Sequence, residues 1–288
     1  MGILSGLKRL GLGNLEKTDI YETEKEEARQ KKKEAPQAAP KPQEKDLIYE
    51  KSYECPVCGS AFSSKIMKSS KARLVGADQD LRPRYEVIDS VKYDVVMCPI
   101  CGYAALGNSF THISPGQAKL IKENICSSVQ ITVYHNDTYS YEEALERYQL
   151  ALASAMVKRA KASEKAFICL KSGWLLRGYA ESLQNSQNSQ ENLENLAQLE
   201  EMKKQEEEYL ENAYKGFMEA RQTENFPMCG MDEITMDYLL SVLAMRFQHY
   251  DVAARLLSTV LTSPSASSRV KDKAREMKDL VLQELRKR

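Results

Sequence analysis

The stretch that decides the N-terminal half of the fold is Cys55-Pro56-Val57-Cys58-Gly59, which returns as Cys98-Pro99-Ile100-Cys101-Gly102. Two residues between thiols is the spacing of a metal knuckle, in which the chain turns tightly and both sulfurs face one ion. Proline stiffens such a turn, and glycine accepts the positive φ that follows it. Because two knuckles supply the four thiolates that Zn²⁺ prefers, the sequence predicts one structural zinc ion held by Cys55, Cys58, Cys98 and Cys101.

Other uses of these cysteines stay open at this point. Iron has the same ligand preference. A redox dithiol fits less well, because it needs one Cys-x-x-Cys at the start of a helix, whereas the motif occurs twice here after strand-like segments. Disulfides are disfavoured because we expect no secretory signal before the folded part. The other three thiols, Cys126, Cys169 and Cys229, have no partner at ligand spacing and are expected to be buried structural residues.

The 39 residues between the knuckles exceed the roughly 15–20 of a compact zinc ribbon, so they must hold structure of their own. The segment 93–97 runs into the second knuckle with a β-rich composition, and 85–88 precedes a turn at Asp89-Ser90. We therefore predict a zinc-binding, β-rich, ribbon-like module over residues 46–112, with two or three strands at the metal. A Cys₄ site leaves no position for water, so this zinc stabilises the fold and activates no nucleophile.

The composition excludes some classes of protein. The chain has 288 residues, 42% apolar and 28% charged, with 41 basic against 41 acidic side chains. The balanced charge gives no global attraction to nucleic acid or acidic lipid. No apolar run approaches the ~20 residues of a membrane-spanning helix, and we expect a cytoplasmic protein.

The first 45 residues are predicted to be a flexible, disordered tail. Residues 22–45 contain charges of both signs, alanine and proline, but no large apolar side chain, so they cannot bury enough surface to order themselves. Residues 1–15 place Ile3, Leu7 and Leu10 at helical spacing. A disordered leader, a docking peptide and a weak contact with a membrane surface are the alternatives for this short apolar segment.

From residue 113 to 288 the apolar period becomes that of an α-helix. Ser114-Pro115-Gly116-Gln117 begins the first helix with an N-cap serine, a proline in the first turn and glutamine at the capping-box position. Little strand signal remains, so the fold class is α+β, predominantly α. Further helices are predicted over about 140–161, 163–180, 191–222, 232–247, 250–261 and 267–288.

Three of these helices share a small–large–small signature at positions i, i+4 and i+7. Alanine lets two backbones approach closely while the large side chain fills the seam. The signature predicts a tetratricopeptide-like antiparallel stack of helices over 113–288, with a plain antiparallel bundle as the alternative. The three triplets are Ala144, Tyr148 and Ala151; Ala213, Phe217 and Ala220; and Ala253, Leu257 and Val260.

Several segments carry a family likeness, of which the most specific is the run from Cys98 to Ala105. The others are Cys55 to Gly59, Asp78 to Asp80 with Tyr85, Phe110, Tyr148 to Leu152, Trp174 with Arg177, and Met231 to Thr235 followed by Tyr238 and Leu239. Together they resemble the uncharacterised bacterial family called domain of unknown function 2225, from about residue 48 to the C-terminus. The resemblance implies a metal-bound β module and tetratricopeptide-like helices, and it implies no activity.

No catalytic constellation is recognised, so we predict no enzyme. Two other groups of residues are candidates for binding. Asp78 and Asp80, with Arg82 and Tyr85, form a candidate polar site, because aspartates at i and i+2 of a strand share one face, where a hard cation or a basic partner could bind. A turn with solvated acids and ion pairs is the alternative. Trp174 and Arg177 share a helical face and are predicted to form either a stacked core pair or the wall of a peptide groove.

The favoured function is a zinc-containing adaptor or scaffold that binds a polypeptide partner through the helical-repeat surface. One alternative is nucleic-acid binding through the basic residues between Lys65 and Arg84. It is not favoured, because residues 46–112 hold eight basic and eight acidic side chains and therefore no basic excess. The other alternative is a metal-dependent enzyme that uses Asp78 and Asp80.

Overall fold

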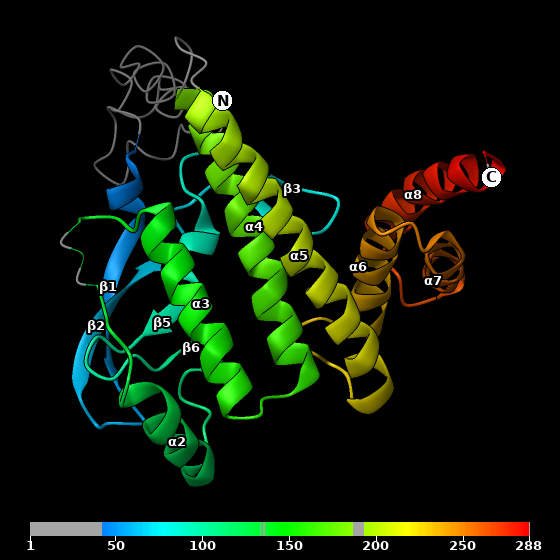
Figure 1. Cartoon of the computed structure of the whole chain (residues 1–288). Helices are drawn as coiled ribbons and strands as arrows, with labels where there is room; N and C mark the ends of the chain where they lie inside the picture. The colour runs from blue at the N-terminus through cyan, green and yellow to red at the C-terminus, as the bar shows by residue number, and fades with distance from the viewer. Residues whose placement is uncertain (1–41, 133, 135, 187–192, 288) are drawn as a thin grey trace, which may run out of the picture. The chain divides into compact units, whose positions relative to one another are not determined.

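The computed structural model describes residues 42–132, 134, 136–186 and 193–287 (Figure 1). Within these ranges six short strands, in three antiparallel pairs, precede seven α-helices, which confirms the predominantly helical α+β class. Of the predicted tail, residues 1–41 and their apolar segment lie outside the described residues. The unit described here is Gln43–Arg288, and it begins with a short 3₁₀ helix, η3 (Glu44–Leu47).

Each cysteine knuckle is the turn of an antiparallel hairpin. The first knuckle joins β1 to β2 and the second joins β5 to β6, so four strands lie at the cysteines, more than the two or three predicted. The difference arises because the segments on both sides of each knuckle pair with one another. The third pair, β3–β4, carries no knuckle. The strands are β1 (Ile48–Glu54), β2 (Ala61–Met67), β3 (Leu74–Ala77), β4 (Pro83–Tyr85), β5 (Val95–Met97) and β6 (Ala104–Leu106).

The β5–β6 hairpin is buried on both faces. On one face Val95, Met97 and Leu106 join the core of the helices. On the other face Val96 and Ala105 pack among the knuckle cysteines. Strands that are covered on both sides have no alternation of apolar and polar residues, and this accounts for the unbroken apolar composition of both strands.

The strand predicted over 85–88 is wrong beyond Tyr85, which ends β4. The reason is Asp89, whose side chain accepts a hydrogen bond from the Val91 amide at 3.1 Å and begins a 3₁₀ helix, η4 (Ser90–Tyr93). A short acidic side chain that bonds its own backbone competes with strand pairing in this way. The extended segment before the second knuckle therefore begins at Val95 rather than at Tyr93.

The helices begin where the sequence predicted, within a few residues. The side chains of Ser114, Ser140, Asp232 and Ser267 each accept an amide hydrogen bond from the first turn of their helix, and the capping box of Ser114 with Gln117 is present. The first helix continues into a π-helical turn, η5 (Lys122–Cys126). The α-helices are α2 (Pro115–Ile121), α3 (Tyr141–Val157), α4 (Ala162–Ser186), α5 (Leu193–Thr223), α6 (Glu233–Arg246), α7 (Tyr250–Thr262) and α8 (Ser268–Arg286).

The small–large–small signature marks the buried seams of the helices. All nine residues of the three triplets are at most 1% exposed. Consecutive helices pack on one another from α3 to α8, and Figure 1 shows α3, α4 and α5 side by side. The tetratricopeptide-like arrangement itself stays a prediction.

Helix α3 joins the strands to the rest of the helices. The Tyr148 hydroxyl donates a hydrogen bond to the Val91 carbonyl oxygen at 3.0 Å, and the Ala104 amide donates one to Ser154 Oγ at 3.3 Å. The core of the helices therefore continues across the boundary predicted at residue 112. None of the described helices combines the length and the apolar composition needed to cross a membrane.

Candidate metal centre

The two knuckles have the same backbone geometry. In the first, the Cys55 amide donates to the Ser60 carbonyl at 2.9 Å and the Gly59 amide donates to the Cys55 carbonyl at 2.8 Å. In the second, the corresponding bonds run from Cys98 to Tyr103 at 2.9 Å and from Gly102 to Cys98 at 3.0 Å. The glycines have φ of +75° and +74°, the conformation predicted for the residue that follows each knuckle.

The four predicted ligands come together. Their sulfur atoms all lie within 4.8 Å of one another. Across the two hairpins, Cys55 Sγ is 3.6 Å from Cys101 Sγ, and Cys58 Sγ is 3.7 Å from Cys98 Sγ. Four sulfurs bound tetrahedrally to one Zn²⁺ at about 2.3 Å lie about 3.8 Å from one another. The donor set and its spacing are therefore compatible with a single zinc ion.

The surroundings of the four sulfurs shift the pKa values of their thiols in different directions. Although burial opposes it, hydrogen bonds from Ser60 lower the pKa of the exposed Cys58 thiol to about 6. A hydrogen bond with Cys101 and burial hold the pKa of Cys55 far above its ordinary value. Burial raises the pKa of Cys98 to about 11. A bound dication would stabilise the negative charge of the thiolates. The buried thiols would therefore lose their protons on binding the metal, because the metal ligand is the thiolate.

An aromatic shell covers the inner side of the knuckles. Tyr103 and Phe110 have ring centroids 5.0 Å apart, and the Tyr103 hydroxyl donates to the Phe110 carbonyl at 3.1 Å. Tyr53 and Phe62 stack at 5.8 Å and meet Phe110 edge-on. Such a shell limits the access of water to a metal site and fixes its ligands.

The other cysteines are placed differently. Cys169 is buried as predicted, whereas Cys126 and Cys229 are only half-buried. Cys126 is the last residue of η5, and burial raises the pKa of its thiol although the nearby Cys101 opposes this. It is a fifth thiol next to the cluster, yet it does not belong to the group of four sulfurs that lie within 4.8 Å of one another.

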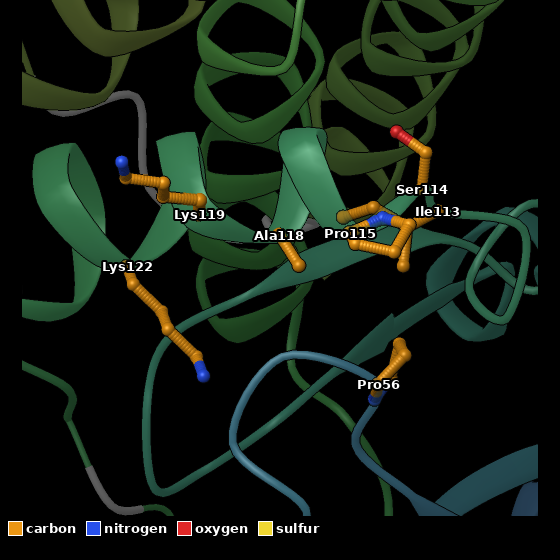
Figure 2. A pocket seen from close by; sticks show the side chains of 7 residues that line it. All are labelled: Pro56, Ile113, Ser114, Pro115, Ala118, Lys119 and Lys122. Atoms are coloured by element: carbon orange, nitrogen blue, oxygen red, sulfur yellow. The ribbon is translucent and has the colours of Figure 1, made fainter.

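A shallow cavity of about 430 Å³ separates the first knuckle from α2. Figure 2 shows Pro56 of the knuckle on one side and Ala118, Lys119 and Lys122 on the other. Ile100, at the tip of the second knuckle, is 65% exposed. The outer side of the candidate metal centre is thus open, in contrast to its aromatic inner side.

The candidate polar site is a salt-bridged turn, the alternative foreseen for it. Asp78 and Asp80 follow β3 in a turn, and Arg177 of α4 reaches both. Its Nη1 lies 3.1 Å from Asp78 Oδ2 and from Asp80 Oδ1, and its Nη2 lies 2.7 Å from Asp80 Oδ2. Asp80 is 5% exposed, so one of the two acids is buried rather than solvated. The structure thus joins residues that the sequence placed in two separate candidate sites.

Two neighbouring arginines, Arg84 in β4 and Arg82 just before it, extend this cluster. Arg82, whose side chain is 3% exposed, lies 2.8 Å from Asp89 Oδ2 and 3.2 Å from Glu181 Oε2 of α4. Arg84 pairs with Asp78 at 2.6 Å and with Glu181. Tyr85 is not part of it, because its side chain packs on the separate cluster around Leu47 and Ile48.

Two more helices take part in the same cluster. Glu206 of α5 accepts a hydrogen bond from Arg177 at 2.9 Å and forms an ion pair with Arg246 of α6 at 3.1 Å. Arg246 also pairs with Glu207 at 3.0 Å. We call the whole set the arginine cluster. Its members are Asp78, Asp80, Arg82, Arg84, Asp89, Arg177, Glu181, Glu206, Glu207 and Arg246.

Trp174 and Arg177 have separate environments. The cation over the Trp174 ring is Lys171, with Nζ 5.7 Å from the ring centroid, and the indole is buried at 4% exposure. Arg177 instead points its guanidinium at carboxylates. Sequence reasoning missed Asp89, Glu181, Glu206 and Arg246; the available signal was the i, i+4 spacing of Arg177 and Glu181, which puts both on one face of α4.

The sequence profile of one protein family, described as uncharacterized protein conserved in bacteria (DUF2225), matches residues 48–281. The chain belongs to this family. The DUF2225 match covers both knuckles, the arginine cluster and most of the helices, and it confirms the resemblance stated above. No curated protein and no solved structure matches the chain. Membership of DUF2225 assigns no activity, so the function has to be argued from the sites themselves.

Proposed function

We propose that this protein is a zinc-stabilised adaptor that binds a segment of a polypeptide partner in a groove between its helices. The zinc ion is structural and is held by Cys55, Cys58, Cys98 and Cys101. The observation that carries the binding function is a groove of about 640 Å³ lined by α4, α6, α8 and the turn after β3.

The zinc part of the proposal rests on the sulfur spacing. Two S···S distances of 3.6 and 3.7 Å match the edge of a zinc–thiolate tetrahedron, about 3.8 Å. All seven cysteines are free thiols, which suits the reducing cytoplasm, and we place the protein there. Since four thiolates leave no open coordination position, the ion organises the two hairpins and takes no part in chemistry.

The groove has the geometry expected of a helical-repeat surface. Arg177 comes from α4, Val242 and Arg246 come from α6, and Met277 and Leu280 come from α8, so every second helix contributes. In a stack of helical hairpins the alternate helices line one continuous face, which such proteins use for binding. This arrangement supports the tetratricopeptide-like prediction. Of the two residues predicted for a peptide groove, Arg177 is among the lining residues and Trp174 is not.

The chemistry of the groove indicates which partner fits. Val242, Met245, Met277 and Leu280 form an apolar floor, and Leu280 is 40% exposed. Residues of the arginine cluster also line the groove, namely Asp78, Asp80, Arg177 and Arg246. The cluster behind them, taken as a whole, holds six carboxylates against four guanidinium groups, a net charge of −2. The matching ligand is a peptide segment with a large apolar side chain next to lysine or arginine.

The alternatives are less well supported. Arg177 and Arg84 already engage Asp78 and Asp80, so these carboxylates are not free to bind a catalytic cation. Among the basic residues considered for nucleic acid, Arg73 pairs with Glu86 at 3.5 Å and Lys68 donates to the Asp46 carbonyl at 3.1 Å. Neither observation favours an enzyme or a phosphate-binding surface.

A peptide-display selection against the purified protein tests the proposal. We expect enriched peptides to combine a large apolar residue with a neighbouring basic residue. Leu280→Glu, in the groove, should weaken their binding at least tenfold. Leu196→Glu on α5 is the matched control, because Leu196 is 50% exposed and does not line the groove. Circular dichroism verifies that both variants fold. Failure to enrich peptides, or equal binding by the two variants, contradicts the groove as the binding site.

A further inference from the structure

A second cavity, separate from the metal centre and from the groove, has a volume of about 630 Å³. Its walls come from the β1–β2 hairpin, the turn after β6, the first turns of α4 and the loop between α5 and α6. Pockets that bind small molecules typically have a volume of about 300–1,000 Å³ and bury about 70–90% of the surface of the ligand. Several segments that are distant along the chain thus meet around polar groups in this cavity.

Most of the charged groups that face this cavity are already paired. Lys171 Nζ lies 2.5 Å from Asp94 Oδ2. Glu164 Oε1 lies 2.7 Å from the ammonium of Lys158, a residue that is 3% exposed. Each of these two pairs has no net charge, so neither attracts a charged ligand.

The third carboxylate of the cavity is held by the start of α4. Glu224, from the loop after α5, accepts hydrogen bonds from the Ser163 amide at 2.9 Å and from the Ser163 hydroxyl at 2.6 Å. It therefore acts as an N-cap supplied from a distance of 61 residues along the chain. The positive end of the helix dipole offsets a good part of its charge.

Two lysines in the walls remain without a counter-ion. Lys51 of β1 and Lys161, next to the start of α4, are both exposed and line the cavity. Within the described residues no carboxylate oxygen lies within 4.0 Å of either ammonium group. Lys51 Nζ lies over the Tyr53 ring, 5.2 Å from its centroid. The wall itself holds three cations and three carboxylates. Lys158 does not line the cavity but pairs with Glu164, so this ammonium group brings the charge of the whole group to +1.

Part of the remaining wall is apolar. Side chains of Tyr53, Ile66, Phe167 and Met228 line the cavity beside the lysines, and Pro227 adds a rigid ring. A small molecule with an apolar part and one negatively charged group could therefore contact the apolar side chains and the lysines at the same time.

We propose that this cavity binds a small organic anion, in which a carboxylate or phosphate group contacts Lys51 and Lys161 and an aromatic or aliphatic body packs on the apolar wall. Phosphate and carboxylate share the chemistry that these lysines recognise, so the experiment has one arm for each. The site does not depend on the proposed peptide groove, since the two cavities share no residue.

Isothermal titration of the full-length protein with phenyl phosphate and with phenylacetate tests the site. We expect saturable binding of one molecule per chain for at least one of the two, and at least tenfold weaker binding of inorganic phosphate and of the neutral alcohol 2-phenylethanol. Absence of saturable binding of both aromatic anions at millimolar concentration overturns the proposal. Equal binding of the neutral alcohol does so as well, because it would show that the lysines contribute nothing.

Charge variants locate the binding. The double substitution Lys51→Gln with Lys161→Gln should weaken binding of the aromatic anion at least tenfold. The double substitution Lys203→Gln with Lys204→Gln removes the same charge from exposed positions of α5 outside the cavity and should leave affinity within twofold. Glu224→Gln keeps an oxygen that can cap α4 and should strengthen binding several-fold. An equal loss in both double variants, or no loss in the first, refutes the assignment.

Discussion

Arg177 holds Asp80 with two parallel hydrogen bonds, from Nη1 to Oδ1 at 3.1 Å and from Nη2 to Oδ2 at 2.7 Å, although 97 residues separate them in the chain. The paired arrangement is the strongest geometry available to an arginine and a carboxylate. Asp80 and Glu206 hold the pKa of Arg177 above its ordinary value although burial opposes this. A charged contact therefore fastens the turn after β3 to α4.

Asp80→Asn should destabilise the protein by about 3 kcal/mol, because it removes the paired carboxylate of a buried ion pair and leaves the Arg177 charge balanced only by Asp78 and Glu206. The free energy of unfolding in urea measures this. Glu86→Gln is the control, since it breaks the Arg73–Glu86 pair, whose side chains are 78% and 54% exposed, and should cost less than about 1 kcal/mol. A similar small loss for both substitutions would mean that the pair at Asp80 contributes little.

The contribution of Asp78 should depend on pH. Burial alone raises the pKa of this carboxyl, but hydrogen bonds from Arg84 and Arg177 outweigh burial and lower it below the ordinary 3.8. A carboxylate with a lowered pKa stabilises the folded state above its unfolded-state pKa, and this stability is lost as the pH falls through the lowered value. The difference in unfolding free energy between wild type and Asp78→Asn should therefore be full above about pH 5 and shrink below about pH 4.

Urea denaturation of both proteins across this range provides the measurement. Any acid-induced release of metal affects wild type and variant alike, so it cancels in the difference. A difference that stays constant from neutral pH to pH 3 would contradict the role given to Asp78.

Cys98→Ser should abolish metal binding. Elemental analysis of the wild type is expected to give one zinc per chain, and the variant should lose the zinc together with the ordered structure of the hairpins, because the ion supplies folding energy to a site of this kind. Cys126→Ser is the matched control: its thiol lies beside Cys101 but outside the group of four, so the zinc should stay. Iron in place of zinc would correct the metal, and a well-folded protein without metal would contradict the site.

Gly178→Ala should destabilise the protein, although alanine is normally the better residue inside a helix by about 1 kcal/mol. A Cβ at position 178 of α4 would lie 2.3 Å from Asp89 Oδ2 and 2.4 Å from Arg82 Nη2, so the buried ion pair has to move. We expect a loss of about 2 kcal/mol or more in unfolding free energy, in the range of overpacked cores. An unchanged or raised stability would show that the pair moves away without cost.

The predictable parts of the molecule were those encoded locally. Ser114, Asp232 and Ser267 begin helices because each side chain bonds an amide three residues ahead, and such a signal lies within four residues of sequence. The knuckles were equally visible, since the two Cys-Pro-x-Cys-Gly frames carry both ligands and turn residues. Only the joining of the two frames required a long-range inference.

The arginine cluster could not be predicted as one site. Asp78 and Arg177 were singled out separately, but nothing within the sequence near either residue indicates that the other lies 3.1 Å away. Asp89 was predicted only as a turn residue, and Glu181 lies one residue past the end of the helix predicted over 163–180. Neither residue was recognised as part of a site, because an ion pair between distant segments leaves no periodic pattern. The hydrogen bond by which Glu224 caps α4 at Ser163 could not be predicted for the same reason.

The hydrogen bonds of α3 have a practical consequence for dissecting the protein. A fragment that begins after residue 112 would lose Val91 and Ala104, and with them the partners of Tyr148 and Ser154, two fully buried side chains. The apolar face of α3 that packs on the strands would then be exposed to water. The shortest fragment expected to fold by itself therefore starts before β5, and removing the metal should loosen α3 along with the hairpins.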